Sequence, residues 1–416
     1  MTENQYYTDV AIVGAGPAGS STSIFLSKAG IKHSIFDQAA FPRDKVCGDG
    51  LSGKVVSYLN QMDKDFVKEM DEEQSFSLDS WGVRFVSPGG YRMDIPYVNH
   101  AESLNHPPGF VVRRSNFDHF LVSKLDPKYA EAHFNHKLIN LQRADKGLEL
   151  TFRNGSQLLS VKTKMVVGAE GDRSMVAKKL ANFTMGDNHY LAGLRVYYHN
   201  IDKMLLGNYI ELHFHKQTLP GYFWIFPLSD GYANVGIAML SRHIKKRGIN
   251  LKKLLNDLLQ QNDDLRYRFR NAQAVSKISG WRLPLGSRKR KISGERFVLT
   301  GDAGSLIDPF TGEGIGNAML SAKAASEMIQ QAVIKNDFSA SLLAGYDQKV
   351  YEHLWDELRV SKAIQKLVQF PWLFNWVIKR VSKRPQLQKT FSSMFNDIDL
   401  RAKLKSPAFY LHLLKS

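Results

Sequence analysis

A glycine-rich turn near the start of the chain most constrains how this protein can fold. Residues 14–19, GAGPAG, match the pattern G-x-G-x-x-G between an apolar, strand-like run and a segment of helical character. Gly14 permits a tight turn, Gly16 lets the backbone approach a pyrophosphate, and Gly19 lets the helix pack closely on the strand. The first amide groups of the helix, near Ala18, would point at the anion. The segment therefore predicts a strand–turn–helix unit that binds a dinucleotide through Gly14, Gly16, Ala18 and Gly19.

An acidic residue closes the second predicted strand, at residues 32–37. In a dinucleotide-binding unit, an acid at this place accepts hydrogen bonds from the ribose hydroxyl groups. Its charge would repel a 2′-phosphate, which argues against NADP in this site. We therefore expect Asp37 to bind the ribose of the cofactor.

A second glycine-rich stretch, late in the chain, favours FAD over NAD. A buried strand predicted at residues 296–300 runs into Gly301 and Asp302, which places a carboxylate where it could hold a ribityl hydroxyl group. Gly312, Gly314 and Ile315 then open a long predicted helix, whose first amide groups can stabilise negative charge on a reduced flavin ring. A plain helix cap needs fewer glycines than this stretch provides.

Four motifs resemble those of the p-hydroxybenzoate-hydroxylase-like flavoproteins. The turn at residues 14–19, the Gly301–Asp302 pair and the segment GAEGDRS at residues 168–174 are similar to the three fingerprints of that family. Glu170 stands where the family usually has aspartate. The segment RSNFD, residues 114–118, resembles the R-x-x-F-D motif, which implies that Arg114 contacts FAD. The resemblance spans roughly residues 9–325 and implies the FAD-binding fold rather than one particular reaction.

Two further segments resemble the geranylgeranyl reductases. Residues 42–50, PRDKVCGDG, are similar to their P-x-x-x-x-C-G-x-G loop, and residues 222–227, YFWIFP, match their Y-x-W-x-F-P motif. The resemblance implies that Cys47 and Gly48 lie beside the flavin and that the aromatic motif lines an apolar cavity for a prenyl chain. The alternation of Tyr222, Trp224 and Phe226 independently places all three on one side of a strand, suited to an apolar ligand or to ordinary core packing.

These motifs favour an FAD-dependent oxidoreductase that reduces C=C bonds of a prenyl or other long apolar substrate. Cys47 is the candidate catalytic residue, for positioning or for proton delivery. An FAD-dependent monooxygenase or halogenase acting on an aromatic or lipid substrate is an alternative, although Tyr222 and Phe226 depart from the W-x-W-x-I-P motif of flavin halogenases. A catalytically silent, flavin-bound lipid or partner binder is a third hypothesis. We find no second strand–G-x-G-x-x-G–helix unit for a nicotinamide cofactor, so NAD(P)H without a domain of its own, or another external donor, could supply the electrons.

The composition of the chain limits which other partners we expect. The chain has a single cysteine and no histidine cluster with a convincing third ligand, so we expect no disulfide and no metal site. The net charge is +16, but no nucleic-acid-binding motif accompanies it, and we expect no nucleic acid partner. The segment FPWLFNWVIKR, residues 370–380, combines bulky apolar residues with cations. It suits either an amphipathic helix on an anionic membrane surface or a helix that covers the mouth of the cavity.

The order of the predicted elements indicates an α/β protein whose chain crosses between two lobes more than once. We expect a discontinuous Rossmann-like FAD-binding domain and an interleaved substrate domain with an antiparallel sheet, followed by a helical C-terminal region. The N-terminus lacks a signal peptide and no segment is suited to span a membrane, so we expect a cytoplasmic protein, in peripheral contact with a membrane if the C-terminal segment provides it. The expected FAD-binding domain comprises residues 1–78, 111–180 and 280–345, the substrate domain residues 79–110 and 181–279, and the C-terminal region residues 346–416.

Overall fold

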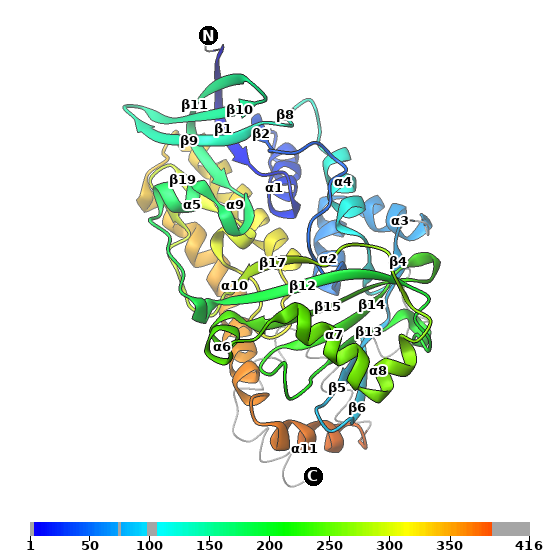
Figure 1. The fold of residues 1–416 in the computed structure, drawn as a ribbon. Helices are drawn as coiled ribbons and strands as arrows, with labels where there is room; N and C mark the ends of the chain where they lie inside the picture. The colour runs from blue at the N-terminus through cyan, green and yellow to red at the C-terminus, as the bar shows by residue number, and fades with distance from the viewer. Residues whose placement is uncertain (1–3, 74–75, 98–105, 385–416) are drawn as a thin grey trace.

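The computed structural model describes residues 4–73, 76–97 and 106–384, and the predicted α/β class is confirmed (Figure 1). Two eight-stranded sheets form the centres of two lobes, and a small three-stranded sheet lies apart from both. The chain passes between the lobes several times, because strands from distant parts of the sequence join each sheet. The small sheet consists of β3 (Gly50–Leu51), β4 (Leu78–Asp79) and β7 (Phe110–Val111).

The first sheet has a parallel centre made of buried apolar strands. Its strand order is β18-β19-β11-β1-β2-β8, and β10 and β9 extend it in antiparallel fashion from β11. Val10, Ala11 and Ile12 of β1 are fully buried, as expected for a strand covered on both faces. The strands are β1 (Asn4–Val13), β2 (His33–Phe36), β8 (Ala130–His133), β9 (Lys137–Ala144), β10 (Gly147–Asn154), β11 (Gln157–Gly168), β18 (Ser293–Gly294) and β19 (Phe297–Leu299).

Helices of this lobe bring the two glycine-rich turns together. The helix α1 packs against α9, and α10 packs against α9 in turn. Because α1 follows the first turn and α9 follows the second, this packing sets the two turns side by side. The helices are α1 (Pro17–Lys28), α2 (Gly53–Met62), α3 (Lys64–Glu72), α4 (Arg114–Ser123), α5 (Met175–Leu180), α9 (Ile315–Lys335) and α10 (Ala340–Leu367).

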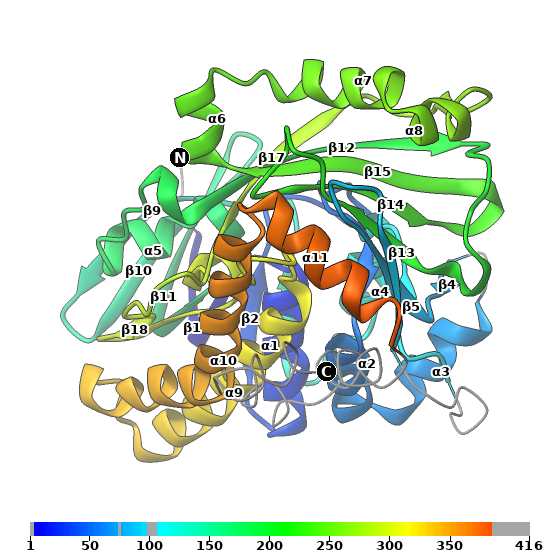
Figure 2. The ribbon, with the colours of Figure 1, turned by 90° about the horizontal axis from the view of Figure 1, so that it is seen from below.

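The second sheet is antiparallel except for the β13–β5 pair, and helices cover both of its faces. Its strand order is β16-β12-β15-β14-β13-β5-β6, with β17 also paired to β12. Helices α6, α7 and α8 lie over one face, and α11 lies on the opposite side (Figure 2). The elements are β5 (Gly82–Val86), β6 (Arg92–Pro96), β12 (Tyr190–His199), β13 (Ile210–His213), β14 (Tyr222–Pro227), β15 (Tyr232–Leu240), α6 (Ser241–Arg247), α7 (Leu251–Gln261), α8 (Asp263–Arg268), β16 (Gln273–Ala274), β17 (Ser279–Pro284) and α11 (Pro371–Val381).

Side chains of β14 divide between two apolar clusters, as the alternation of a strand requires. Phe223 and Ile225 pack with Leu255 and Leu258 of α7 beneath the outer helices. Tyr222 and Trp224 belong to the cluster on the other face, together with side chains of α11. The sheet therefore separates a helix-covered core from the face that adjoins the first lobe.

The predicted domain limits remain a prediction, and the structure adds two facts to them. Strand β17 spans the expected boundary between residues 279 and 280 and pairs within the second sheet. Helix α10 begins at Ala340, ahead of the expected start of the C-terminal region at residue 346. Residues 1–3, 74–75, 98–105 and 385–416 of the predicted domains lie outside the described residues. In the part of the chain that is described, no helix combines the length and apolar character that a bilayer crossing demands.

Candidate functional site

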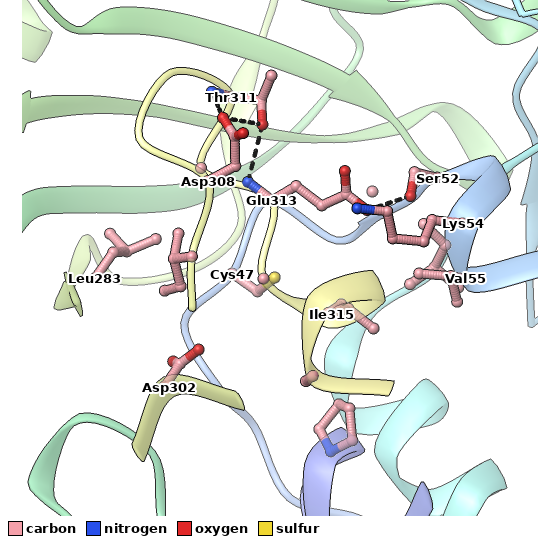
Figure 3. Close-up of a pocket in the computed structure, with 18 of the residues that line it drawn as sticks. Cys47, Ser52, Lys54, Val55, Leu283, Asp302, Asp308, Thr311, Glu313 and Ile315 are labelled. Carbon is pink, nitrogen blue, oxygen red and sulfur yellow. Dashed lines mark hydrogen bonds between the residues drawn. The ribbon is translucent and has the colours of Figure 1, made fainter. Parts of the chain in front are cut away.

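One large cavity lies where the two lobes meet. Its volume is about 1440 Å³, and residues of both glycine-rich turns, the second sheet, α10 and α11 line it. Figure 3 shows the part around Cys47, with Asp302 on one side and Ile315 at the start of α9 on another. All twelve residues predicted to bind the cofactor lie in or beside this cavity, and all except Gly19 line it directly. The three aromatic residues predicted to contact the substrate line it as well.

The first turn has the geometry that an approaching pyrophosphate needs. A Cβ atom on Gly14 would lie 2.4 Å from the carbonyl oxygen of Ala169, and one on Gly19 would lie 1.7 Å from that of Gly14. These two glycines are required by packing within the protein. A Cβ on Gly16 would meet only the Nη2 atom of Arg43, at 3.5 Å. Gly16 therefore faces open space in the cavity, which fits a cofactor that approaches the backbone at this point.

Asp37 lines the cavity and also holds the turn. One of its carboxylate oxygens accepts a 2.7 Å hydrogen bond from the amide of Ala15, and the other accepts one of 2.9 Å from the amide of Ala39. A carboxylate retains acceptor capacity after one bond to each oxygen. The position thus fits the predicted bond to ribose and fixes the turn at the same time.

Asp302 faces the cavity from a short 3-10 helix at residues 301–304, which follows β19 (Figure 3). Its carboxylate accepts no hydrogen bond from the described residues, which fits a partner such as a ribityl hydroxyl group. Burial raises the pKa of Asp302, and the charges of Lys45 and Arg114 oppose this shift. The two cations therefore favour the ionised form of Asp302, which accepts hydrogen bonds.

The second turn delivers the N-terminus of α9 to the cavity. Gly312 has φ of +74°, and a Cβ there would lie 2.7 Å from the hydroxyl oxygen of Tyr222. Gly314 is the N-cap residue of α9, and no acidic side chain lies in the first turn of the helix. The unpaired amide groups near Ile315 are therefore free to interact with negative charge on a ligand ring.

The loop that carries Cys47 joins the cavity to a buried ion-pair cluster. Cys47 is partly exposed and lines the cavity together with Arg114. Arg114 donates two hydrogen bonds to Asp118, of 2.7 and 2.8 Å, and Arg43 forms a 3.0 Å ion pair with the same carboxylate. Arg114 is thus fixed in place by Asp118, at the edge of the same cavity.

A buried polar network that the sequence analysis missed fixes the same loop. The Asp49 carboxylate accepts hydrogen bonds of 2.7 Å from both Asn234 and Tyr197. Asn234 also donates to the carbonyl oxygen of Cys47, at 2.7 Å, and accepts from Nε1 of Trp224, at 2.9 Å. Burial raises the pKa of Asp49 to about 6, although these hydrogen bonds oppose the shift. The network connects the cysteine loop to the aromatic strand β14.

The aromatic wall, defined here as Tyr222, Trp224 and Phe226, contacts both loops of the site. Tyr222 donates a hydrogen bond from its hydroxyl group to the carbonyl oxygen of Thr311, beside the second glycine turn. Phe226 packs so closely on the cysteine loop that a Cβ on Gly48 would lie 3.0 Å from its ring. The predicted alternation is confirmed, and the wall continues into the apolar cluster of β5, β13 and α11.

Two cations in the loop were also not predicted as functional. Arg43 lies beside Gly16, and Lys45 lies in the same region as Asp302. The Lys45 ammonium sits 3.9 Å from the ring centre of Trp281, and burial lowers its pKa to about 8. These positions in the folded chain, Arg43 beside the first turn and Lys45 near Asp302, identify the two cations as candidates to contact the anionic part of a dinucleotide.

A small polar patch interrupts the apolar lining near α2 and α9. Ser52 donates a hydrogen bond to Glu313, and Lys54 bonds to Asn317 at 2.8 Å and to Glu357 at 3.0 Å (Figure 3). These groups satisfy one another, so the patch can meet a polar group of a ligand without carrying an isolated buried charge.

Glu170, which stands in place of the aspartate of the family fingerprint, has a structural role. Its carboxylate accepts hydrogen bonds from Ser174 Oγ at 2.5 Å and from the amides of Met175 and Val176 at 2.9 and 3.2 Å. The longer side chain therefore caps α5, and the turn keeps its shape.

Comparison with known proteins decides the family. A family model described as an FAD binding domain matches residues 7–361. The chain belongs to this FAD-binding family. FAD is thus the cofactor of this flavoprotein, as the fit of Gly16, Asp302 and the start of α9 already indicated.

Relatives of the flavoprotein include reductases. A digeranylgeranylglycerophospholipid reductase of Thermoplasma volcanium is 27% identical over 367 residues, which is 87% of this chain and 88% of the relative. A menaquinone reductase of Mycobacterium tuberculosis is 28% identical over 331 residues, or 77% of this chain and 76% of the relative. These relatives confirm the predicted resemblance to the geranylgeranyl reductases and an FAD-dependent oxidoreductase, with a reductase favoured over a monooxygenase.

Solved structures confirm the fold of the flavoprotein. A geranylgeranyl bacteriochlorophyll reductase-like protein of Thermoplasma acidophilum superposes with a TM-score of 0.80 at 21% identity, covering 97% of this chain and 99% of the other. A flavin-dependent brominase superposes with a TM-score of 0.77 at 19% identity, covering 99% and 100%. At such identities the likeness concerns the fold alone, which serves more than one reaction.

Proposed function

We propose that this flavoprotein reduces isolated C=C bonds in a prenyl chain or another long apolar substrate. The observation that carries the proposal is that one cavity extends from the glycine turns to the aromatic wall and α11. A cavity of about 1440 Å³ exceeds the usual range for a small-molecule site, about 300–1,000 Å³, and suits a dinucleotide together with a second, long ligand. The names of the two reductase relatives support the same substrate class.

The surroundings of the aromatic wall suit a chain without polar groups. Tyr222 and Trp224 are buried, and their polar atoms already bond to Thr311 and Asn234. An apolar ligand therefore leaves no buried donor of the wall unpaired. Such apolar surroundings disfavour water near the reacting bond, which matters because an isolated alkene has no neighbouring carbonyl group to stabilise developing charge.

FAD held by Gly16, Asp302 and the start of α9 would, when reduced, supply hydride chemistry at one alkene carbon, and the protein itself must supply a proton to the other. Cys47 is our candidate for positioning the alkene or delivering that proton, because it lines the cavity next to Gly48, against which Phe226 packs. The loop around the thiol is fixed by Asn234, so the thiol occupies a defined place.

An anaerobic turnover experiment tests the proposal. The bound FAD is reduced chemically, which makes the natural electron donor unnecessary, and a geranylgeranyl lipid or an aromatic compound is then added. We expect the prenyl lipid to reoxidise the flavin without oxygen and to gain two hydrogen atoms for each bond reduced. Reoxidation that requires oxygen, with an oxygen or halogen atom added to the aromatic compound, would support a monooxygenase or halogenase instead. No turnover of either compound would support a flavin-bound lipid binder.

A further inference from the structure

Helix α11 has two faces of different character. Phe374, Ile378 and Val381 are buried in the apolar cluster of the second sheet, and Leu373 and Val377 beside them line the cavity. The predicted segment at residues 370–380 therefore covers the apolar end of the cavity, as one of the two interpretations of the sequence required. This use accounts for only one side of the helix.

The other side of α11 presents aromatic residues and cations to solvent. Trp372 is 70% exposed and Phe370, just before the helix, is 56% exposed, although both are large apolar residues. At helical spacing from Trp372, the same stripe continues with the exposed Lys379 and Lys383, whereas Trp376 is partly buried and lines the cavity. Such a stripe of aromatic rings and cations is the pattern of a helix that lies in a membrane interface.

Charge in this part of the chain has one sign. From residue 360 to residue 384 the sequence contains six Lys or Arg and no Asp or Glu. A second copy of this chain would be a poor partner for the surface, because the whole protein carries a net charge of +16. An anionic lipid surface is complementary to both the cations and the exposed rings.

We propose that the outer face of α11, with Phe370, Trp372, Lys379 and Lys383, docks on an anionic lipid bilayer. The helix that closes the apolar end of the cavity then lies at the membrane surface. Resting on the proposed function, this arrangement lets a prenyl substrate pass from the bilayer into the cavity beside α11 without crossing water. The two interpretations of the C-terminal segment thus describe the two faces of one helix.

Sedimentation of the full-length holoprotein with lipid vesicles tests the surface without any activity measurement. Vesicles of phosphatidylcholine alone are compared with vesicles that also contain phosphatidylglycerol. We expect binding to the anionic vesicles that weakens with added salt. The double variants Phe370→Ser with Trp372→Ser and Lys379→Glu with Lys383→Glu should each weaken that binding at least about tenfold.

Matched controls place the same chemical changes elsewhere on the surface. Ile334→Ser alters an exposed apolar residue at the end of α9, and Lys252→Glu with Lys253→Glu reverses two exposed charges on α7. Figure 2 shows α7 on the opposite face of the second sheet from α11. We expect the controls to bind vesicles like the unaltered protein. Absent binding by the unaltered protein, or equal losses in the controls and the α11 variants, would overturn the proposal.

Activity on detergent-solubilised geranylgeranyl lipid separates this inference from the proposed function. None of the four altered side chains of α11 lines the cavity, so we expect both double variants to reduce the solubilised lipid at the normal rate. Vesicle binding with no reduction of any prenyl lipid would overturn the proposed function and leave the membrane surface in place. Reduction of the solubilised lipid without vesicle binding would overturn the membrane surface and leave the proposed function in place.

Discussion

The side-chain amide of Asn234 donates a 2.7 Å hydrogen bond to the main-chain carbonyl oxygen of Cys47. Asn234 lies on β15 in the second sheet and is fully buried, whereas Cys47 lies in a loop of the first lobe. The same amide binds Asp49, two residues further along that loop. One side chain of the second lobe therefore fixes the loop that carries Cys47.

Replacing Asn234 tests this connection. Asn234→Ala leaves a buried carbonyl group without a donor and removes one of the donors to Asp49. We expect the free energy of unfolding to fall by about 2 kcal/mol. Turnover should fall further than FAD affinity, because the loop near Cys47 loses its position while the glycine turns keep theirs. Asn256→Ala, on the exposed side of α7, is the control and should change the unfolding free energy by about 0.5 kcal/mol or less. Equal effects of the two substitutions would contradict a positioning role.

The raised pKa of Asp49 should make the free energy of unfolding depend on pH. Burial raises the pKa of Asp49 from 3.8 to about 6, so the folded protein retains this proton where the unfolded chain has lost it. The stability that Asp49 contributes is therefore full below about pH 4 and falls as the pH rises toward 6. Between these limits the loss is roughly 3 kcal/mol. Urea unfolding of the unaltered protein and of Asp49→Asn across this range tests this. As the pH rises, the free energy of unfolding of the unaltered protein should fall relative to that of Asp49→Asn. A difference that does not change with pH would mean that Asp49 is already ionised in the folded state.

A substitution of Gly16 should weaken FAD binding without affecting folding. Its backbone has φ of −72° and ψ of −173°, which any residue can adopt, and a Cβ there would meet only the end of Arg43. Gly16→Val should leave the melting temperature of the FAD-free protein nearly unchanged and weaken FAD binding about a hundredfold, equivalent to about 3 kcal/mol. Gly19→Ala should instead prevent normal folding, because its Cβ would lie 1.7 Å from the oxygen of Gly14. Fluorescence titration with FAD and thermal melts separate the two effects. Tight FAD binding by Gly16→Val would refute this account of the turn.

Loss of the proton from Lys45 should set an upper pH limit for tight binding of FAD. Burial, followed by the charge of Arg114, lowers the pKa of Lys45 to about 8, and Asp302 acts in the opposite direction. An anionic cofactor favours the protonated amine, so the dissociation constant of FAD should increase as the pH rises through 8. Lys45→Met should bind FAD about tenfold more weakly at neutral pH and show no such increase, whereas Lys45→Arg should retain tight binding at higher pH. An unchanged pH profile in Lys45→Met would show that another group is responsible.

Local patterns in the sequence predicted much of the fold and part of the site. The glycine turns, Asp37 and Asp302 could be predicted because each depends on its place at the end of a strand or the start of a helix. The side of β14 that carries Trp224 could be predicted because strand side chains alternate. The helices α6, α7 and α8 were not anticipated, although the helical spacing of Leu251, Leu255 and Leu258 in α7 was a usable signal.

Contacts between distant segments could not be predicted in this way. Asn234 and Cys47 are 187 residues apart, and nothing near Asn234 marks it as the partner of a loop in the other lobe. Arg43 and Lys45 lie within a recognised loop, but only the folded chain shows that they adjoin Gly16 and Asp302. Burial and partner geometry, rather than residue type, assign these residues to the site.

The proposed function requires a prenyl chain to lie in the cavity between the cysteine loop and α11. A geranylgeranyl analogue with a photoreactive group at its far end tests this location directly, by peptide mass spectrometry after illumination of the full-length holoprotein. We predict cross-links to cavity-lining residues such as Trp224, Phe374 and Val377, and their loss when unlabelled geranylgeranyl lipid is added. Cross-links confined to the outer helices α6, α7 and α8, or unaffected by the competitor, would contradict the account.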